Sequence, residues 1–169
     1  ALSNVDPVMT KLEREGAIFV ESLEEVPEGQ RVIFSAHGVA PSEWDRAAER
    51  RLRVIDATSP LVTKVHSAVD LYASEDKTVV LIGHAGHEEV KGTLGVAPGK
   101  VLLVGTVEEA ATIEVPDAAR VAAATQTTLS VDDTRDIMAE LKRRFPALAT
   151  PKTDDICRSE EHTSELQSR

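Results

Sequence analysis

Six short apolar runs recur along the chain, separated by polar segments. They span residues 17–20, 31–35, 53–57, 78–83, 101–105 and 119–125. Most of these runs are continuously apolar and do not alternate between polar and apolar positions. Continuous apolar strands of this length are typical of parallel sheets that are covered on both faces. The pattern therefore predicts six short, mostly buried strands.

Two of the intervening segments repeat their apolar residues with helical spacing. The first has Val62, Val65, Val69 and Tyr72, and the second has Val131, Thr134, Met138, Leu141 and Phe145. Each set predicts an amphipathic helix with one buried stripe. Ser59 before Pro60, and Ser130 three residues before Asp133, are typical residues at a helix start, while Pro146 marks a helix end. Alternating strands and helices indicate an α/β fold.

A short segment repeats and suggests an internal duplication. Residues 20–25 and 104–109 each place a serine or threonine two residues before a pair of glutamates, and we interpret these pairs as solvated helix starts. We expect two similar three-layer α/β domains with mostly parallel sheets. The predicted domains are residues 1–59, a partial first domain, and 60–153, the second; residues 154–157 would begin a third. Residues 158–169 lack any apolar period, which predicts a disordered tail that also looks like a translated sequencing adapter.

Charge and cysteine content narrow the function. The net charge of −10 disfavours nucleic acid and anionic membranes as partners. An anionic substrate stays possible, because helix N-termini and local donors can hold a phosphate in an acidic protein. Cys157 is the only cysteine, so the chain has no internal disulfide, which suits a reducing cytosol. The sequence contains no run of 18 apolar residues, so no membrane span is predicted.

Three of the predicted strands end in polar residues. The strand at 31–35 leads to His37; the strand at 78–83 leads to His84, His87 and Glu89; the strand at 119–125 leads to Gln126, Thr127 and Thr128. Ligands of α/β sheets bind beyond the carboxyl ends of the strands. We therefore expect these residues to form an anion site, in which Glu89 could transfer protons.

Each candidate also has a simpler interpretation. His37 could be a hydrogen-bonded structural residue, and His66, beside a buried helix stripe, a second one. Thr127 and Thr128 could merely cap the following helix. Together, His84, His87 and Glu89 could bind zinc, although the histidine pairs of metalloproteases lie four residues apart on a helix and this pair lies three apart around a glycine.

Five stretches, taken in order, carry a resemblance to a known family. They are Phe34-Ser-Ala-His-Gly38, Asp56-Ala-Thr-x-Pro-Leu-Val-Thr-Lys-Val-His66, Gly83-His-Ala-Gly-His87-x-Glu89, Thr125-Gln-Thr-Thr-Leu-Ser-Val-Asp-Asp-Thr134 and Asp154-Asp-Ile-Cys157. From about residue 12 to 157 the chain resembles the 4-hydroxy-3-methylbut-2-enyl diphosphate reductases. The resemblance implies a cytoplasmic bacterial enzyme of the non-mevalonate isoprenoid pathway. Such an enzyme has three α/β domains around a [4Fe-4S] cluster held by cysteines, and ferredoxin or flavodoxin supplies its electrons.

The resemblance also implies roles for individual residues. His37, His87 and Thr127 would contact the substrate, with both histidines at its diphosphate. Glu89 would deliver a proton to the departing hydroxyl, and isopentenyl and dimethylallyl diphosphate would form. Cys157 would bind the cluster, but Ser59 stands at the position of a second cluster cysteine, and thiolates are the expected ligands. We therefore expect no stable cluster and no reductase activity from this chain. One alternative is a cluster-free diphosphate-binding module, and a second is a zinc hydrolase that uses His84, His87 and Glu89. Apolar surface should be exposed where a further domain would pack.

Overall fold

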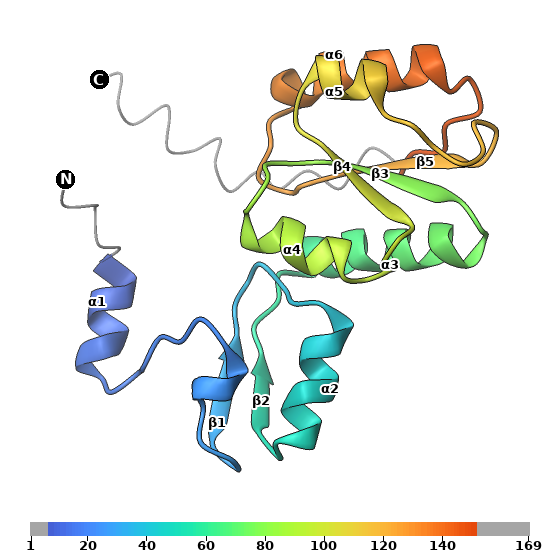
Figure 1. Cartoon of the computed structure of the whole chain (residues 1–169). Coiled ribbons are helices and arrows are strands. Elements are labelled where there is room, and N and C mark those ends of the chain that lie inside the picture. The colour runs from blue at the N-terminus through green and yellow to red at the C-terminus, as the bar shows by residue number, and fades with distance from the viewer. Residues whose placement is uncertain (1–6, 152–169) are drawn as a thin grey trace, which may run out of the picture.

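Strands and helices alternate along residues 7–151, the part of the chain that the computed structural model describes (Figure 1). The strands are β1 (Arg31–Phe34), β2 (Arg53–Asp56), β3 (Thr78–Ile82), β4 (Val101–Val104) and β5 (Val121–Thr125). The helices are α1 (Pro7–Arg14), α2 (Pro41–Glu49), α3 (Pro60–Ser74), α4 (Glu88–Leu94), α5 (Val107–Thr112) and α6 (Val131–Arg144), with a 3-10 turn at Leu23–Glu25. All strand pairs are parallel, in two sheets ordered β1-β2 and β4-β3-β5. The predicted α/β class with parallel sheets is confirmed.

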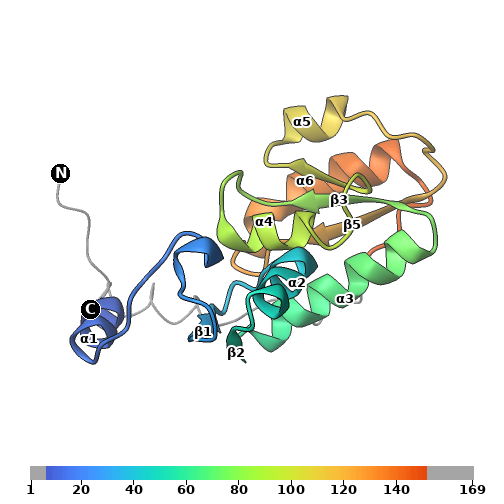
Figure 2. The same ribbon diagram turned by 60° about the horizontal axis from the view of Figure 1, so that its bottom comes forward.

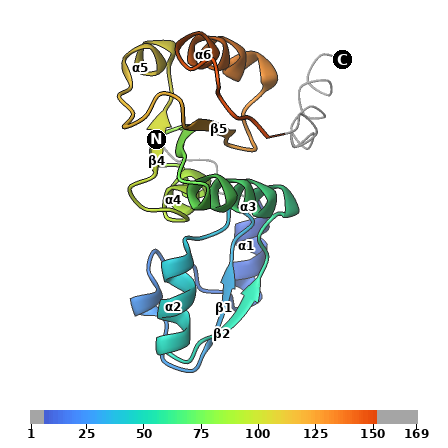
Figure 3. The same cartoon turned by 90° about the vertical axis from the view of Figure 1, so that its right-hand side faces the viewer.

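The larger sheet is the middle of three layers. Figure 3 shows α5 and α6 on one face of this sheet and α3 and α4 on the other, and Figure 2 shows α5 and α6 side by side. Along β3, Val80 and Ile82 pack with the residues of α5 and α6, whereas Val79 and Leu81 pack with those of α3 and α4. Because successive side chains of a strand point to opposite faces, a strand covered on both sides must be continuously apolar. This explains the unbroken run at 78–82.

The smaller sheet is buried on one face only. Val32, Phe34 and Val54 pack against α2 and the 3-10 turn. On the opposite face Ile33 pairs with Ile55 in register, and these side chains are 64% and 52% exposed. The expectation of strands covered on both faces is thus wrong for β1 and β2 within the described residues. A run of apolar residues predicts that a strand forms, but it does not predict which elements cover the faces of that strand.

Residues 17–20, the first predicted strand, do not form one. They adopt no regular structure, and Ile18 is 86% exposed and Phe19 47%. In the described part of the chain β1 pairs only with β2, and residues 17–20 pair with neither strand. A strand needs a partner for its hydrogen bonds, and the apolar character of four residues does not supply one.

Both predicted helix starts are confirmed. The Ser59 hydroxyl accepts the N–H of Leu61 at the start of α3, with Pro60 in the first turn, and the Ser130 hydroxyl accepts the N–H of Asp133 at the start of α6. The buried stripe of α6 differs slightly from the predicted one, because Val131 is 54% exposed and Ile137 is buried instead. Helix α6 ends at Arg144, just before the predicted stop.

The repeated segments fold alike at their turns. The Ser22 hydroxyl accepts the N–H of Glu24 and the Glu25 carboxylate accepts the N–H of Ser22; likewise Thr106 accepts the N–H of Glu109, whose carboxylate accepts the N–H of Gly105. These reciprocal bonds satisfy amides that the helix start leaves free. The glutamate pairs therefore do mark helix starts.

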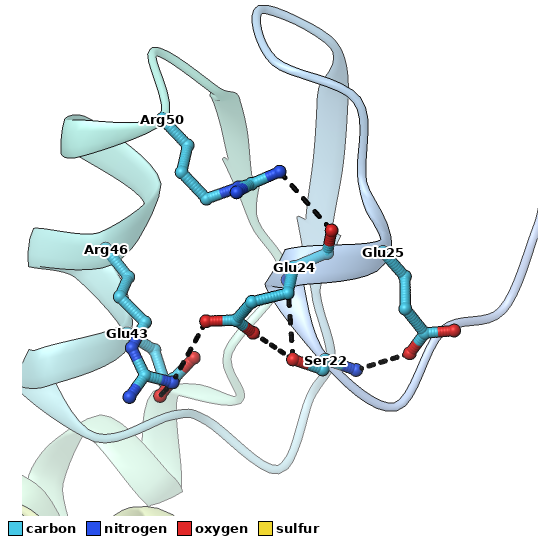
Figure 4. Close-up of polar contacts among 6 residues, drawn as sticks. All are labelled: Ser22, Glu24, Glu25, Glu43, Arg46 and Arg50. Atoms are coloured by element: carbon cyan, nitrogen blue, oxygen red, sulfur yellow. Dashed lines mark hydrogen bonds and ion pairs between the residues drawn. The ribbon is translucent and has the colours of Figure 1, made fainter.

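The first of these turns is tied to α2 by two arginines, as Figure 4 shows. Arg46 lies 3.6 Å from the Glu24 carboxylate, and Arg50 donates to the carbonyls of Glu24 and Val26. The hydroxyl of Ser22, more than the arginines, holds the pKa of Glu24 below its ordinary value. The contacts orient the segment that precedes β1.

The predicted boundary between domains, near residue 59, stays a prediction. The predicted third-domain start and tail, at 154–169, lie outside the described residues. Among residues 7–151, no helix is both long and apolar enough to cross a membrane.

Candidate functional site

The loop after β1 presents His37 at the surface. Its turn is closed by the Gly38 N–H, which donates to the Ser35 carbonyl at 3.1 Å, and Gly38 adopts φ +72°, a conformation that favours glycine. The His37 side chain is exposed, and its Nδ1 lies 3.4 Å from the Ser35 hydroxyl, too long for a firm bond. The structural interpretation of His37 is therefore weak, and its ring is available to a ligand.

His87 follows β3 and begins α4. Its Nδ1 accepts the N–H of Glu89 at 3.1 Å, so the neutral ring carries its proton on Nε2. The ring centroids of His37 and His87 are 5.2 Å apart, edge to face. The carboxyl ends of two strands thus bring two imidazoles together at a helix N-terminus, as the sequence predicts. Nε2–H of His87 and the ring of His37 can hold one anion between them.

Glu89 and Thr127 form a buried pair next to these rings. The Glu89 side chain is 1% exposed and Thr127 is 7% exposed. The two carboxylate oxygens accept the Thr127 N–H at 2.7 Å and the Thr127 hydroxyl at 2.8 Å. Thr127 therefore does not cap α6, as one interpretation proposed; Ser130 does. A buried carboxyl group that is hydrogen-bonded to a hydroxyl is suited to proton transfer.

Gln126 and His84 support the site through the backbone. The Gln126 side chain accepts the N–H of His84 at 3.0 Å and donates to the Thr128 hydroxyl at 2.7 Å. It thereby joins the loops that follow β3 and β5. The imidazole of His84 is exposed. Gln126 was visible in the sequence as a strand-end residue, but its bridging role depends on a contact 42 residues away.

His66 lies below the His37 loop on α3. Burial holds the pKa of His66 below its ordinary value, while the negative charge of Glu89 acts in the opposite direction. Its Nε2 is buried and has no hydrogen-bond partner among the described residues. His66 is therefore a packed, uncharged residue at neutral pH, close to the interpretation that the sequence favours.

Ser59 adjoins the His37 loop, since its N–H donates to the Ala36 carbonyl at 3.0 Å. The turn before it is held by Asp56, which accepts the N–H and hydroxyl of Thr58 at 2.9 and 2.5 Å. These bonds, the hydroxyl first, lower the pKa of Asp56. The Ser59 hydroxyl itself accepts the N–H of Leu61 at 3.4 Å. A serine at this helix start therefore acts as a cap.

The described residues do not supply a metal-binding set. Residues 7–151 contain no group of three or more histidine, cysteine or carboxylate side chains placed to hold an ion. Cys157 lies outside this range. The structure also does not support zinc at His84, His87 and Glu89, because His87 Nδ1 and both Glu89 oxygens already accept hydrogen bonds. The residues that are described do not fit an iron–sulfur cluster, whose usual ligands are several thiolates.

Comparisons with known proteins agree on one family. A family model described as "LytB protein" matches residues 3–168. A 4-hydroxy-3-methylbut-2-enyl diphosphate reductase from Leifsonia xyli is 55% identical over 150 residues, which are 89% of this chain and 44% of that relative. One from Burkholderia mallei is 54% identical over 89% of this chain and 46% of its own length. The chain thus spans about half the length of the curated relatives it matches.

Solved structures give the same result. The E-1-hydroxy-2-methyl-but-2-enyl-4-diphosphate reductase from Plasmodium falciparum superimposes with a TM-score of 0.88 and 41% identity, over 94% of this chain and 50% of that chain. A second structure, described as (E)-4-hydroxy-3-methyl-but-2-enyl diphosphate reductase, the terminal enzyme of the non-mevalonate pathway, gives a TM-score of 0.76 and 31% identity over 96% of this chain and 59% of that chain.

Proposed function

Because the chain belongs to the LytB protein family, we propose that it forms the substrate-binding part of a 4-hydroxy-3-methylbut-2-enyl diphosphate reductase. One observation carries this proposal: His37 and His87 lie 5.2 Å apart, beside the buried pair of Glu89 and Thr127. The substrate of such a reductase carries an anionic diphosphate, and loss of its hydroxyl requires a proton. The site must therefore bind an anion and supply a proton. The named activity of the relatives supports the same reaction, in which two electrons from an external donor and two protons replace the hydroxyl by hydrogen and release water.

In this proposal His37 and His87 hold the diphosphate. The N-terminus of α4, where His87 is the cap, adds the partial positive charge of a helix start. These fixed donors let a chain of net charge −10 bind an anion. Titration calorimetry with isopentenyl diphosphate tests this directly. We expect saturable binding that is weakened about tenfold or more when His87 is replaced by phenylalanine, the equivalent of one lost charged hydrogen bond.

A control variant separates this site from general charge effects. His84→Phe removes an exposed imidazole from the same loop without touching the paired rings. It should bind isopentenyl diphosphate as the unchanged chain does. Equal loss in His84→Phe and His87→Phe would contradict the assignment.

Glu89 supplies the proton for the departing hydroxyl, with Thr127 as its link to the substrate. Because Glu89 is 1% exposed, its carboxyl group reaches a substrate oxygen only through a neighbour. The Thr127 hydroxyl lies 2.8 Å from it and can donate one proton while it accepts another. In an active full-length relative, Thr127→Val should therefore lower kcat more than it raises KM, whereas Thr127→Ser should retain most activity. Equal loss in both variants would contradict the relay.

The residues that the structure describes do not fit the iron–sulfur cluster of the family. We infer instead that this chain binds a diphosphate without turnover, because Ser59 lies at the cap of α3 and its hydroxyl is a weak iron ligand. Anaerobic reconstitution with iron and sulfide tests this inference. We expect no stoichiometric bound cluster; a brown protein with one cluster per chain would refute it.

We further propose that the whole enzyme takes its electrons from ferredoxin or flavodoxin and is cytoplasmic, as the resemblance to the reductase family implies. A pull-down of the full-length protein with reduced ferredoxin or flavodoxin would test the donor.

A further inference from the structure

The loop that carries His37 packs against α4 through main-chain atoms and a single methyl group. A Cβ atom added at Gly92 would lie 3.1 Å from the carbonyl oxygen of Gly38. One added at Gly95 would lie 2.3 Å from the Cβ atom of Ala40. Carbon atoms in contact keep roughly 3.5–4.0 Å between them, so an alanine at Gly95 would displace the loop or the helix by roughly 1 Å.

Backbone conformation does not require either glycine. Gly95 has φ −75° and ψ −10°, which any residue adopts, and Gly92 lies inside α4, where alanine has the higher helix propensity. What matters at Gly92 and Gly95 is therefore the absence of a side chain. It allows the helix and the loop to approach closely.

The same loop is confined from its other side by α3. A Cβ atom at Gly38 would lie 2.9 Å from Val62 Cγ1 and 3.2 Å from His66 Cε1. Gly38 is thus held between two helices, with little room to shift toward either. Interiors packed in this way transmit a displacement instead of absorbing it.

Helix α4 links this packing to the site. It has seven residues and begins at its cap, His87, while Gly95 caps its other end. A short helix moves as one body, so a change at Gly95 changes the position of His87 relative to the loop. The two imidazoles, whose ring centroids are 5.2 Å apart, thus stand on the two sides of this contact, one on the loop and one on α4.

We propose that Gly92 and Gly95 are positioning residues, which fix the separation of His37 and His87 and thereby the size of the anion that both rings can hold together. The part that concerns the anion rests on the proposed function. The part that concerns the separation does not, because it can be measured without a ligand.

The test is a set of variants in which the same contact is broken and then restored. Gly95→Ala introduces the contact with Ala40, and the double variant Gly95→Ala, Ala40→Gly removes it. The first readout is the NMR cross-relaxation peak between the ring protons of His37 and His87 in the chain without ligand. The second is the affinity for isopentenyl diphosphate by calorimetry. Lys91→Ala, on the exposed side of α4, is the matched control.

We expect Gly95→Ala to weaken the cross-peak and to lower the affinity about tenfold, the equivalent of one lost charged hydrogen bond. The double variant should restore both, and Lys91→Ala should change neither. If Gly95→Ala does not fold, Ala40→Val presses on the same contact from the loop and should weaken the same cross-peak.

Two outcomes would overturn the inference: an undiminished cross-peak in the folded Gly95→Ala or Ala40→Val chain, or a double variant that leaves the cross-peak weak. A chain that shows the expected cross-peaks and binds no diphosphate would refute the proposed function alone.

Discussion

Replacing Thr127 with valine removes one hydroxyl from the buried contact with Glu89 and keeps the shape of the side chain. The backbone N–H of residue 127 still donates to one carboxylate oxygen at 2.7 Å, so only the 2.8 Å bond to the other oxygen is lost. Because Glu89 is 1% exposed, water cannot replace that bond without rearrangement. The variant therefore isolates the energy of a single buried hydrogen bond to a carboxylate.

The expected loss is about 2 kcal/mol, within the range for a buried hydrogen bond to a charged group. In a chain of this size such a loss lowers Tm by about 4–8 °C. Thr127→Ser keeps the hydroxyl and removes one methyl group, which should cost about 0.8 kcal/mol. The valine variant should therefore be about 1 kcal/mol less stable than the serine variant.

Urea unfolding followed by circular dichroism measures both values. A second background sharpens the result: in a Glu89→Met chain the Thr127 hydroxyl has lost its acceptor, so Thr127→Val should cost less than about 0.5 kcal/mol. Equal losses for valine and serine at position 127, or a valine effect that is unchanged by Glu89→Met, would refute the assigned contact.

Further predictions concern residues around the site and on the open sheet. Burial lowers the pKa of His66 in the folded chain, so the unfolded chain binds a proton more readily below about pH 6.5 and stability should fall as the pH drops through that range. Urea midpoints at pH 7.5 and 5.5 should therefore differ less in His66→Gln than in the unchanged chain, and an equal difference would contradict this. Replacing Ile33 and Ile55, 64% and 52% exposed, together by lysine should reduce aggregation in light scattering with little change in Tm; undiminished aggregation would show that another surface is responsible. Ser59→Ala should cost about 0.5 kcal/mol, the low end for a cap, because its bond to Leu61 is 3.4 Å long; a loss several times larger in urea unfolding would show that Ser59 does more than cap α3.

The sequence predicts the elements whose signals are local. The strands from β1 to β5, the starts of α3 and α6, and the glutamate-marked turns all follow from nearby residues. Residues 17–20 show the limit of this reasoning, because a strand also needs a partner that the apolar pattern does not name. The exposed face at Ile33 and Ile55 has the same origin.

The site divides in the same way. The sequence marks His37 and His87 as strand-end residues, where ligands of α/β sheets bind. Their approach to 5.2 Å is a tertiary property, because β1 and β3 belong to different sheets. The bond between Glu89 and Thr127 spans 38 residues, and Thr127 alone looked like a helix cap. The close packing at Gly92 and Gly95 is likewise a tertiary property. In the sequence, a glycine that is packed against another segment cannot be told from one that has open space around it.

The central claim is that the paired imidazoles of His37 and His87 bind a diphosphate. The most direct test follows the histidine ring signals by NMR while isopentenyl diphosphate is added to the chain. The account predicts that the signals of His37 and His87 shift together along one saturable curve, while that of the exposed His84 shifts far less. Unchanged signals from His37 and His87, or a dominant shift at His84, would contradict it.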